Sequence, residues 1–97
     1  MKKEEFRNWM LKRKRMYNGK MDYYTETAVK SRISCLERLE NHFNIDLDSK
    51  VTDKSIAEQF LQDIRDAKIE NITRTPLSNA FRHYFEFATG LHIDRIF

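Results

Sequence analysis

A chain of 97 residues is long enough for one domain with a single core and too short for two ordinary domains. Its 40% hydrophobic residues exclude a disordered chain, and its two Gly and one Pro argue against a turn-rich β protein. The formal net charge is +3, but residues 1–20 carry eight Lys or Arg against Glu4 and Glu5, so the positive charge is concentrated at one end and favours an anionic partner.

The first predicted helix covers residues 3–17. At 100° per residue its apolar side is formed by Phe6, Trp9, Met10, Met16 and Tyr17. Arg13 falls inside this apolar arc. Asn18 and Gly19 then form a turn pair that interrupts the helical period. We expect an amphipathic helix with a basic outer side, followed by a flexible hinge.

The second predicted helix covers residues 26–43, after the capping residue Thr25 and before Asn44, which tolerates the left-handed conformation. Its apolar side is formed by Ala28, Val29, Ile33, Leu36, Leu39 and Phe43. Arg32 and Glu40 intrude on this side. We expect their long side chains to lie at the edges of the core with their charges in water.

The third predicted helix covers residues 53–68, after the capping residue Thr52. Its apolar side is formed by Ile56, Ala57, Phe60, Leu61, Ile64 and Ala67. Its outer side mixes acidic and basic side chains. A mixed surface of this kind is a poor candidate for contact with a polyanion.

The fourth predicted helix covers residues 76–89, with Thr75 as the cap, Pro76 at the first helical position and Gly90 just beyond the end. Its apolar side is formed by Leu77, Ala80, Phe81, Tyr84, Phe85, Phe87 and Ala88. Its polar side is formed by Ser78, Asn79, Arg82, His83, Glu86 and Thr89. Four amphipathic helices joined by short connections predict an all-α, single compact four-helix domain over residues 1–97.

The last segment, residues 91–97, reads LHIDRIF and is too short to form a domain. Its apolar side chains are Leu91, Ile93, Ile96 and Phe97. Two interpretations stay open. The segment packs back over the core, or it docks on a protein partner.

The sequence shows no pattern typical of catalysis or metal binding. His42, His83 and His92 lack the short spacing of zinc ligands, and Cys35 is the only cysteine. Two isolated glycines form no phosphate-binding loop. We therefore expect a protein that is not an enzyme and binds no cofactor or metal. The single cysteine, with no signal peptide or membrane-spanning run, predicts a cytoplasmic location and no membrane partner.

The polar sides of the helices carry hydroxyl, amide and guanidinium groups, the types that contact phosphates and base edges. The candidate DNA-binding residues are Arg7, Lys12, Lys14, Arg15, Lys30, Ser34, Arg38, Arg74, Ser78, Asn79, Arg82 and His83. The KRKR cluster at 12–15 predicts salt-sensitive, sequence-indifferent affinity for duplex DNA. The alternative that these are ordinary solvated helix faces stays open.

Four segments follow one another along the chain: FRNWM, TAVKSRISCLERLENHF, TDKSIAEQFLQDI and LSNAFRHYFEFATG. In pattern and order they resemble the core-binding, SAM-like N-terminal domain of tyrosine recombinases and phage integrases. The resemblance implies a four-helix unit that clamps one face of the DNA duplex, with its second and fourth helices near the major groove. The contacts that it implies come from Lys30, Ser34, Arg38, Ser78, Asn79 and Arg82.

The family's catalytic domain, with its Arg and His pocket and nucleophilic tyrosine, has no counterpart in this sequence. The resemblance therefore implies a non-catalytic DNA-binding module, and DNA handling more firmly than DNA recombination. Two alternatives stay open: a domain of a longer integrase, or a free-standing relative that binds DNA or a DNA-handling protein without cutting it. A rival hypothesis is a small inhibitor or adaptor that docks on a larger protein through residues 91–97 and the basic N-terminal arm.

Overall fold

The computed structural model describes residues 1–71 and 73–94. Its elements, in chain order, are α1 (Lys3–Leu11), β1 (Lys14–Tyr17), β2 (Lys20–Tyr23), α2 (Glu26–Phe43), the 3₁₀ turn η1 (Leu47–Lys50), α3 (Lys54–Asp66) and α4 (Pro76–Thr89). The described residues are mainly helical and contain four α-helices, as the sequence predicts. The strictly all-α prediction is wrong, because β1 and β2 form a two-stranded antiparallel sheet.

The bounds of α2 and α4 agree with the predicted residues, and so do most of their end signals. The Thr25 hydroxyl accepts the backbone N–H of Ala28 at 3.1 Å, which satisfies one of the free donors at the start of α2. Asn44 ends α2 with a left-handed φ of 53°, and Gly90 ends α4 with a φ of 75°. Pro76 occupies the first position of α4, where its missing N–H removes no helical bond.

The first helix is shorter than predicted, because α1 ends at Leu11. Asn18 and Gly19 connect the paired residues Tyr17 and Lys20 and both have positive φ, 50° and 78°. A two-residue connection of this kind matches the right-handed twist of a hairpin, and Asn-Gly is its preferred sequence. The expected flexible hinge is therefore the tight turn of a β-hairpin.

The start of α3 also differs from the prediction. The cap is Asp53 instead of Thr52, since the Asp53 carboxylate accepts the backbone N–H of Ile56 at 2.9 Å. Ile56 is 39% exposed, so its predicted place in the core is wrong. The remaining predicted apolar side of α3 is correct at Phe60, where the ring is buried against Phe81.

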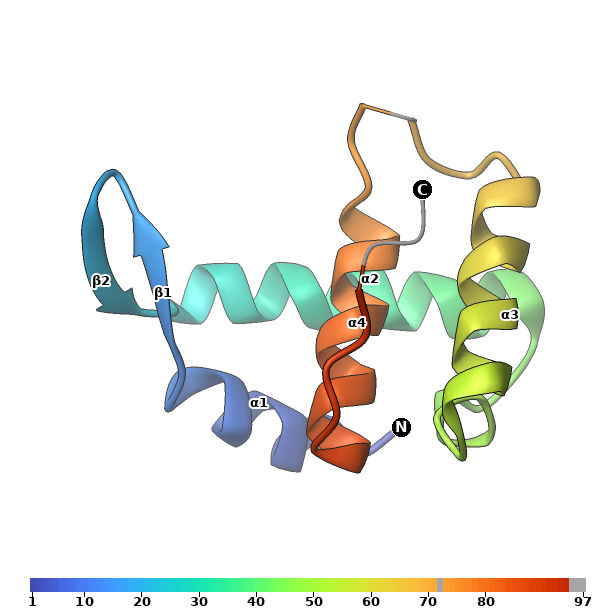
Figure 1. The fold of residues 1–97 in the computed structure, drawn as a ribbon, viewed down its shortest axis with the longest axis horizontal. Helices are drawn as coiled ribbons and strands as arrows, with labels where there is room; N and C mark the ends of the chain where they lie inside the picture. The colour runs from blue at the N-terminus through green and yellow to red at the C-terminus, as the bar shows by residue number, and fades with distance from the viewer. Residues whose placement is uncertain (72, 95–97) are drawn as a thin grey trace.

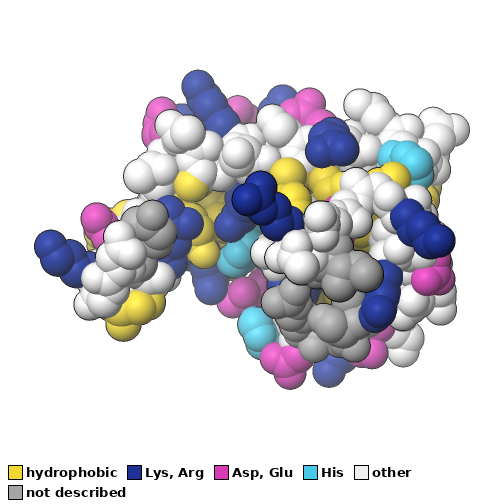
Figure 2. Space-filling view, turned by 90° about the horizontal axis from the view of Figure 1, so that it is seen from above, with side chains coloured by type: hydrophobic (Ala, Val, Ile, Leu, Met, Phe, Trp, Pro, Cys, Tyr) yellow, Lys and Arg dark blue, Asp and Glu magenta, His cyan; other side chains and the backbone are white. Residues whose placement is uncertain are grey.

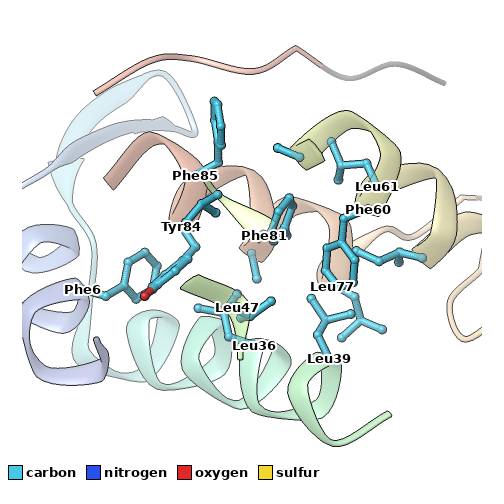
Figure 3. Packing of buried hydrophobic residues seen from close by; sticks show 14 of the residues in the cluster. Phe6, Leu36, Leu39, Leu47, Phe60, Leu61, Leu77, Phe81, Tyr84 and Phe85 are labelled. Atoms are coloured by element: carbon cyan, nitrogen blue, oxygen red, sulfur yellow. The ribbon is translucent and has the colours of Figure 1, made fainter. Parts of the chain in front are cut away.

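α2 is the longest helix of the described residues, and α1 and α4 pack against it (Figure 1). α4 crosses α2 and also contacts α1 and α3, so side chains from all four helices meet in one core. Figure 3 shows this core, in which Phe81 of α4 points toward Phe60 of α3 and Tyr84 lies beside Phe6 of α1. Fully burying a large apolar side chain contributes roughly 1.5–3 kcal/mol, so this shared core stabilises the fold.

Polar contacts fix the start of the chain to the core. The Met1 ammonium donates to Asp46 at 2.8 Å and lies 3.5 Å from Glu40. The Tyr84 hydroxyl accepts the backbone N–H of Lys2 at 2.8 Å and donates to Asp48. These bonds join α1 to η1 and α4, which positions the hairpin that follows α1.

Candidate nucleic-acid interface

The β1–β2 hairpin projects from one end of the helical body (Figure 1). Three lysines on it or directly before it are exposed: Lys12, Lys14 and Lys20. Lys12 and Lys14 belong to the predicted basic cluster, but Lys12 lies at the end of α1 and Lys14 lies in β1. The Lys14 ammonium lies 5.2 Å from the centre of the Tyr23 ring, a cation–π contact that keeps the charge at the surface. We refer to Lys12, Lys14 and Lys20 as the hairpin lysines.

One face of the hairpin is apolar and open to solvent. The register pairs Met16 with Met21 and Lys14 with Tyr23, and side chains of paired residues share a face. Met16 is 65% exposed, Met21 58% and Tyr23 53%. The prediction that Met16 packs into the core through a helix is therefore wrong, because the strand turns it away from the body.

The other face of the hairpin turns toward the helical body. The Arg15 guanidinium lies 4.9 Å from the centre of the Tyr24 ring, and the Tyr24 ring makes an edge contact with His83 of α4 at 5.9 Å. Arg13 pairs with Glu86 of α4 at 3.0 Å and stacks over Trp9 at 4.3 Å. In the sequence Arg13 falls inside the apolar arc of the predicted helix. In the structure its contacts with Glu86 and Trp9 hold it against the helical body.

Arginines from three parts of the fold act on His83 or on the ring beside it. Arg13, Arg32 and Arg82 lower the pKa of His83, and Arg15 lies over the Tyr24 ring that contacts His83; we call Arg13, Arg15, Arg32 and Arg82 the arginine cluster. In the view of Figure 2, Lys and Arg side chains gather around a hollow between the hairpin and the helical body, with a histidine inside it. Because the group combines a strand, α2 and α4, only the folded chain brings it together.

The pKa of the His83 imidazole reflects its burial and the charges near it. Burial lowers the pKa of the His83 imidazole to about 4, and the nearby positive charges of Arg32, Arg13 and Arg82 act in the same direction. Glu86 acts in the opposite direction. His83 is therefore neutral at physiological pH, and the space around it is positive. The prediction that His83 contacts DNA stays a prediction, and the imidazole would take part as a neutral hydrogen-bonding group.

The polar side of α4 is partly covered by the chain that follows it. Asn79, Arg82, His83 and Glu86 line a cavity of about 350 Å³ together with residues 92–94. His92 lies 3.9 Å from Glu86, which attaches the segment to the helix. The outer side of α4 is therefore less accessible than its sequence suggests.

The structure corrects the prediction that Ser78 lies on the exposed polar side of α4. Ser78 is only 3% exposed, and its hydroxyl donates to Glu70 in the loop before α4. The same Glu70 carboxylate accepts the backbone N–H of Leu77 at 3.0 Å. Ser78 serves the start of the helix and does not face solvent, so it is unsuitable as a DNA contact.

The predicted contacts on α2 lie on another surface. Lys30, Ser34 and Arg38 are exposed. Lys30 and Ser34 line a groove between α1 and α2 with Arg7, which pairs with Glu26 at 2.6 Å. Arg38 and Ser34 project from the side of α2 opposite its buried side chains.

The second and fourth helices therefore do not present one common polar surface. α4 packs across the buried side of α2, and residues 91–94 run along the outer side of α4 (Figure 1). Arg38 on α2 and Arg82 on α4 consequently point to different sides of the helix pair. The joint clamp predicted from these two helices stays a prediction.

The predictions for Arg74 and for the tail at residues 91–97 have different outcomes. Arg74 is exposed in the loop before α4. Ile93 is buried at 1% exposure, so the interpretation that the tail packs back over the core is correct at Ile93, whereas Leu91 is 58% exposed. Ile96 and Phe97 lie outside the described residues. The tail thus offers Leu91 but not Ile93 to a protein partner.

Four members of the candidate interface were not among the predicted contact residues: Arg13, Arg32, Tyr24 and Lys20, although Arg13 lies within the predicted KRKR cluster. The first two carried a signal in the sequence, since each is a charged residue on an otherwise apolar helical arc. Such a residue either extends to the surface or serves a buried polar site. Tyr24 carried no signal of this kind, because its position depends on the hairpin.

Within residues 1–71 and 73–94 no group of three or more His, Cys, Asp or Glu side chains is arranged to hold a metal ion. In the same part of the chain no helix combines the length and the apolar character needed to cross a membrane. The arrangement is thus that of a mainly helical domain with a projecting basic hairpin. No model of a known protein family matches this chain, and searches of curated proteins and of solved structures found no match either.

Proposed function

We propose that this chain is a non-catalytic DNA-binding module that contacts duplex DNA with the β1–β2 hairpin and the arginine cluster at its base. The observation that carries the proposal is the projection of the exposed hairpin lysines from the body, on the side where the arginines gather. Cations that neutralise phosphates release bound counterions, which drives association with DNA. A two-stranded ribbon also fits the width of the major groove.

The resemblance to the core-binding, SAM-like domains of tyrosine recombinases supports the same class of function. Four helices follow in the same order, and α2 packs directly against α4. The proposed contact surface departs from what the resemblance implies. It uses the hairpin and the side of α4 that faces it, and it leaves out Ser34 and Arg38 on the far side of α2.

The proposal is tested by the fluorescence anisotropy of a labelled duplex over a series of salt concentrations. The double variant Lys12→Gln/Lys20→Gln removes two hairpin charges, and the matched control Lys54→Gln/Lys68→Gln removes two exposed charges at the ends of α3. Each lost phosphate contact should reduce the slope of log affinity against log salt by about 0.9. We expect a reduction of roughly two contacts in the hairpin variant and no change in the control.

Absence of binding by the unmodified chain at low salt would refute the DNA-binding function. An equal loss in the two double variants would show that net charge, and not the hairpin, determines the affinity. Both outcomes are measurable with the same labelled duplex, and circular dichroism of each variant checks that the helices are retained.

A protein-docking function is the second candidate, and the apolar hairpin face favours it. Met16, Met21 and Tyr23 form an exposed cluster at the most projecting part of the molecule. Exposed apolar groups of this kind are typical of contact surfaces. The variant Met16→Gln/Met21→Gln separates the two functions. If the lysines bind DNA, this variant should keep its affinity for the duplex. If the apolar face docks on a protein, the variant should lose partner binding. Sedimentation first measures whether the unmodified chain self-associates and whether the variant loses that self-association.

A further inference from the structure

One face of the β1–β2 hairpin combines exposed apolar side chains with positive charge. Side chains alternate between the two faces of a strand, so Lys14, Met16, Met21 and Tyr23 share this face. Met16 is 65% exposed and Met21 58%, and the register places them directly opposite each other. Opposed side chains have Cβ atoms about 4.5–5.5 Å apart, so the two methionines form one continuous apolar surface.

Asp22, the one acidic residue between Lys12 and Tyr24 in the sequence, lies on the other face of the hairpin. It alternates with its neighbours along β2 and is opposite Arg15 in the register. Its carboxylate accepts the backbone N–H of Tyr23 at 2.8 Å. The charge that shares a face with the methionines is therefore the positive charge of Lys14.

Positive charge lies on both sides of the methionine pair along the hairpin. Lys14 comes before Met16, on the side of the helical body, and Lys20 lies beside the turn; both lysines are exposed. The hairpin projects from the body, so this surface is open to a large partner (Figure 1). A partner that covers the methionines meets ammonium groups at either end of the apolar surface. The pattern fits a partner with anionic groups on both sides of a narrow apolar strip.

We propose that Met16 and Met21 contact the C5-methyl groups of thymine in the major groove of duplex DNA. This inference rests on the proposed DNA-binding function and assigns the bases that the hairpin prefers. The major groove is about 12 Å wide and admits a two-stranded ribbon, and thymine is the base that places a methyl group in it. Methionine suits this contact, because its unbranched thioether chain adapts to uneven apolar surfaces.

The same charge pattern disfavours two other partners. A hairpin that enters a lipid bilayer turn first would bury Lys20 ahead of the methionines, and burying a charged group in lipid is costly. Two copies packed through this face would bring the Lys14 side chains of both copies into one interface, where like charges repel. Duplex DNA offers phosphates to the lysines and methyl groups to the methionines at the same time.

The test compares two labelled duplexes by fluorescence anisotropy. One contains a central run of A·T pairs, and the other carries deoxyuridine in place of every thymine, which removes only the C5-methyl groups. One buried methyl group contributes a factor of about four in affinity, so we expect the unmodified chain to prefer the thymine duplex by that factor or more. The ratio of the two affinities should stay constant as salt weakens both, because the phosphates are identical.

Substitution of the two methionines should remove this preference. We expect Met16→Gln/Met21→Gln to bind both duplexes alike, within about twofold of the affinity of the unmodified chain for the deoxyuridine duplex. The deoxyuridine duplex is therefore the one that separates DNA binding from protein docking in this variant. Met16→Leu/Met21→Leu retains an apolar surface of similar volume and should retain the preference.

Two controls change exposed groups other than the methionines. Ile56→Gln removes an exposed apolar side chain on α3 and should change neither the affinity nor the preference. Lys12→Gln/Lys20→Gln should weaken binding to both duplexes equally and leave the preference unchanged, since the lysines contact phosphates. Circular dichroism of each variant checks that the helices are retained.

Equal affinity of the unmodified chain for the two duplexes would overturn the inference and leave the proposed function intact. Absence of binding to both duplexes at low salt would refute the proposed function and the inference with it. A preference for thymine that Met16→Gln/Met21→Gln retains would also overturn the inference, because other residues would then contact the methyl groups. Methionine-dependent binding to anionic vesicles, or methionine-dependent self-association, with equal affinity for the two duplexes would assign this face to lipid or to a second copy.

Discussion

Glu70 accepts the backbone N–H of Leu77 at 3.0 Å and so caps α4 from a position seven residues earlier in the chain. It also accepts from the N–H and the hydroxyl of Ser78. Thr75 stands where a helix cap is expected, but its side chain makes no capping bond. The start of α4, and with it the position of Arg82 and His83, therefore depends on Glu70.

Replacement of Glu70 should destabilise the protein more than replacement of Thr75. We expect Glu70→Ala to lower the free energy of unfolding by about 1–2 kcal/mol, since it removes a cap and leaves the buried Ser78 hydroxyl without an acceptor. Thr75→Ala should change it by less than about 0.5 kcal/mol. Urea denaturation measures both, and a larger effect of Thr75→Ala would contradict the assignment of the cap.

The hydroxyl of Tyr84 should contribute to stability through the two groups that it joins. Burial raises the pKa of Tyr84, and its hydrogen bond to Asp48 acts in the same direction. Tyr84→Phe would leave the Lys2 N–H without its acceptor, and we expect a loss of roughly 1–3 kcal/mol. Tyr23→Phe is the matched control at an exposed ring and should be nearly neutral. Equal effects in denaturation would show that the Tyr84 hydroxyl is not needed.

The hairpin turn should be sensitive to the residue at position 19. Gly19 has a φ of 78°, so alanine is strained there by about 1 kcal/mol even though the surrounding space is open. We expect Gly19→Ala to weaken the cross-strand NMR contacts of the hairpin and its DNA affinity, with the helical circular dichroism unchanged. Gly19→Asn should have a smaller effect, because asparagine tolerates positive φ. A loss of helicity in Gly19→Ala would show that the core depends on the hairpin.

His83 should make the protein less stable in mild acid. The unfolded chain takes up a proton at the ordinary pKa of 6.5, whereas folded His83 does so at about 4. The unfolded state therefore binds more protons in this window, and stability falls as the pH drops from about 6.5 to 4, by on the order of 1–3 kcal/mol. Denaturation at several pH values should show this drop reduced in His83→Gln and retained in His42→Gln, which removes an exposed ring. A drop of undiminished size in His83→Gln would show that another group causes the acid sensitivity.

The parts of the fold that local signals determine could be predicted from the sequence. Thr25 and Asn44 delimit α2, and Pro76 and Gly90 delimit α4, because caps and positive-φ positions act within a few residues. The hairpin was missed because the helical spacing of Met16 and Tyr17 outweighed the Asn18-Gly19 pair. That pair fixes a two-residue turn, and the turn then decides which flanking residues form strands.

The candidate site was less predictable, because its members meet through the tertiary structure. The sequence identified Arg15, Arg82 and His83, but it grouped them with residues on the far side of α2. Ser78 appeared exposed by its helical position, and the long-range bond to Glu70 buries it. The Nε of Arg32 is buried without a hydrogen-bond partner among the described residues, and no local pattern in the sequence predicts this.

The central claim, that the hairpin side of the molecule contacts DNA, is tested most directly by NMR chemical-shift mapping of the chain during titration with duplex DNA at low salt. The account predicts that the largest shifts fall on residues 12–24 and on the side chains of Arg32 and His83, with little change on the outer side of α3. Absence of any shift, or shifts confined to Ser34 and Arg38 on the far side of α2, would contradict it.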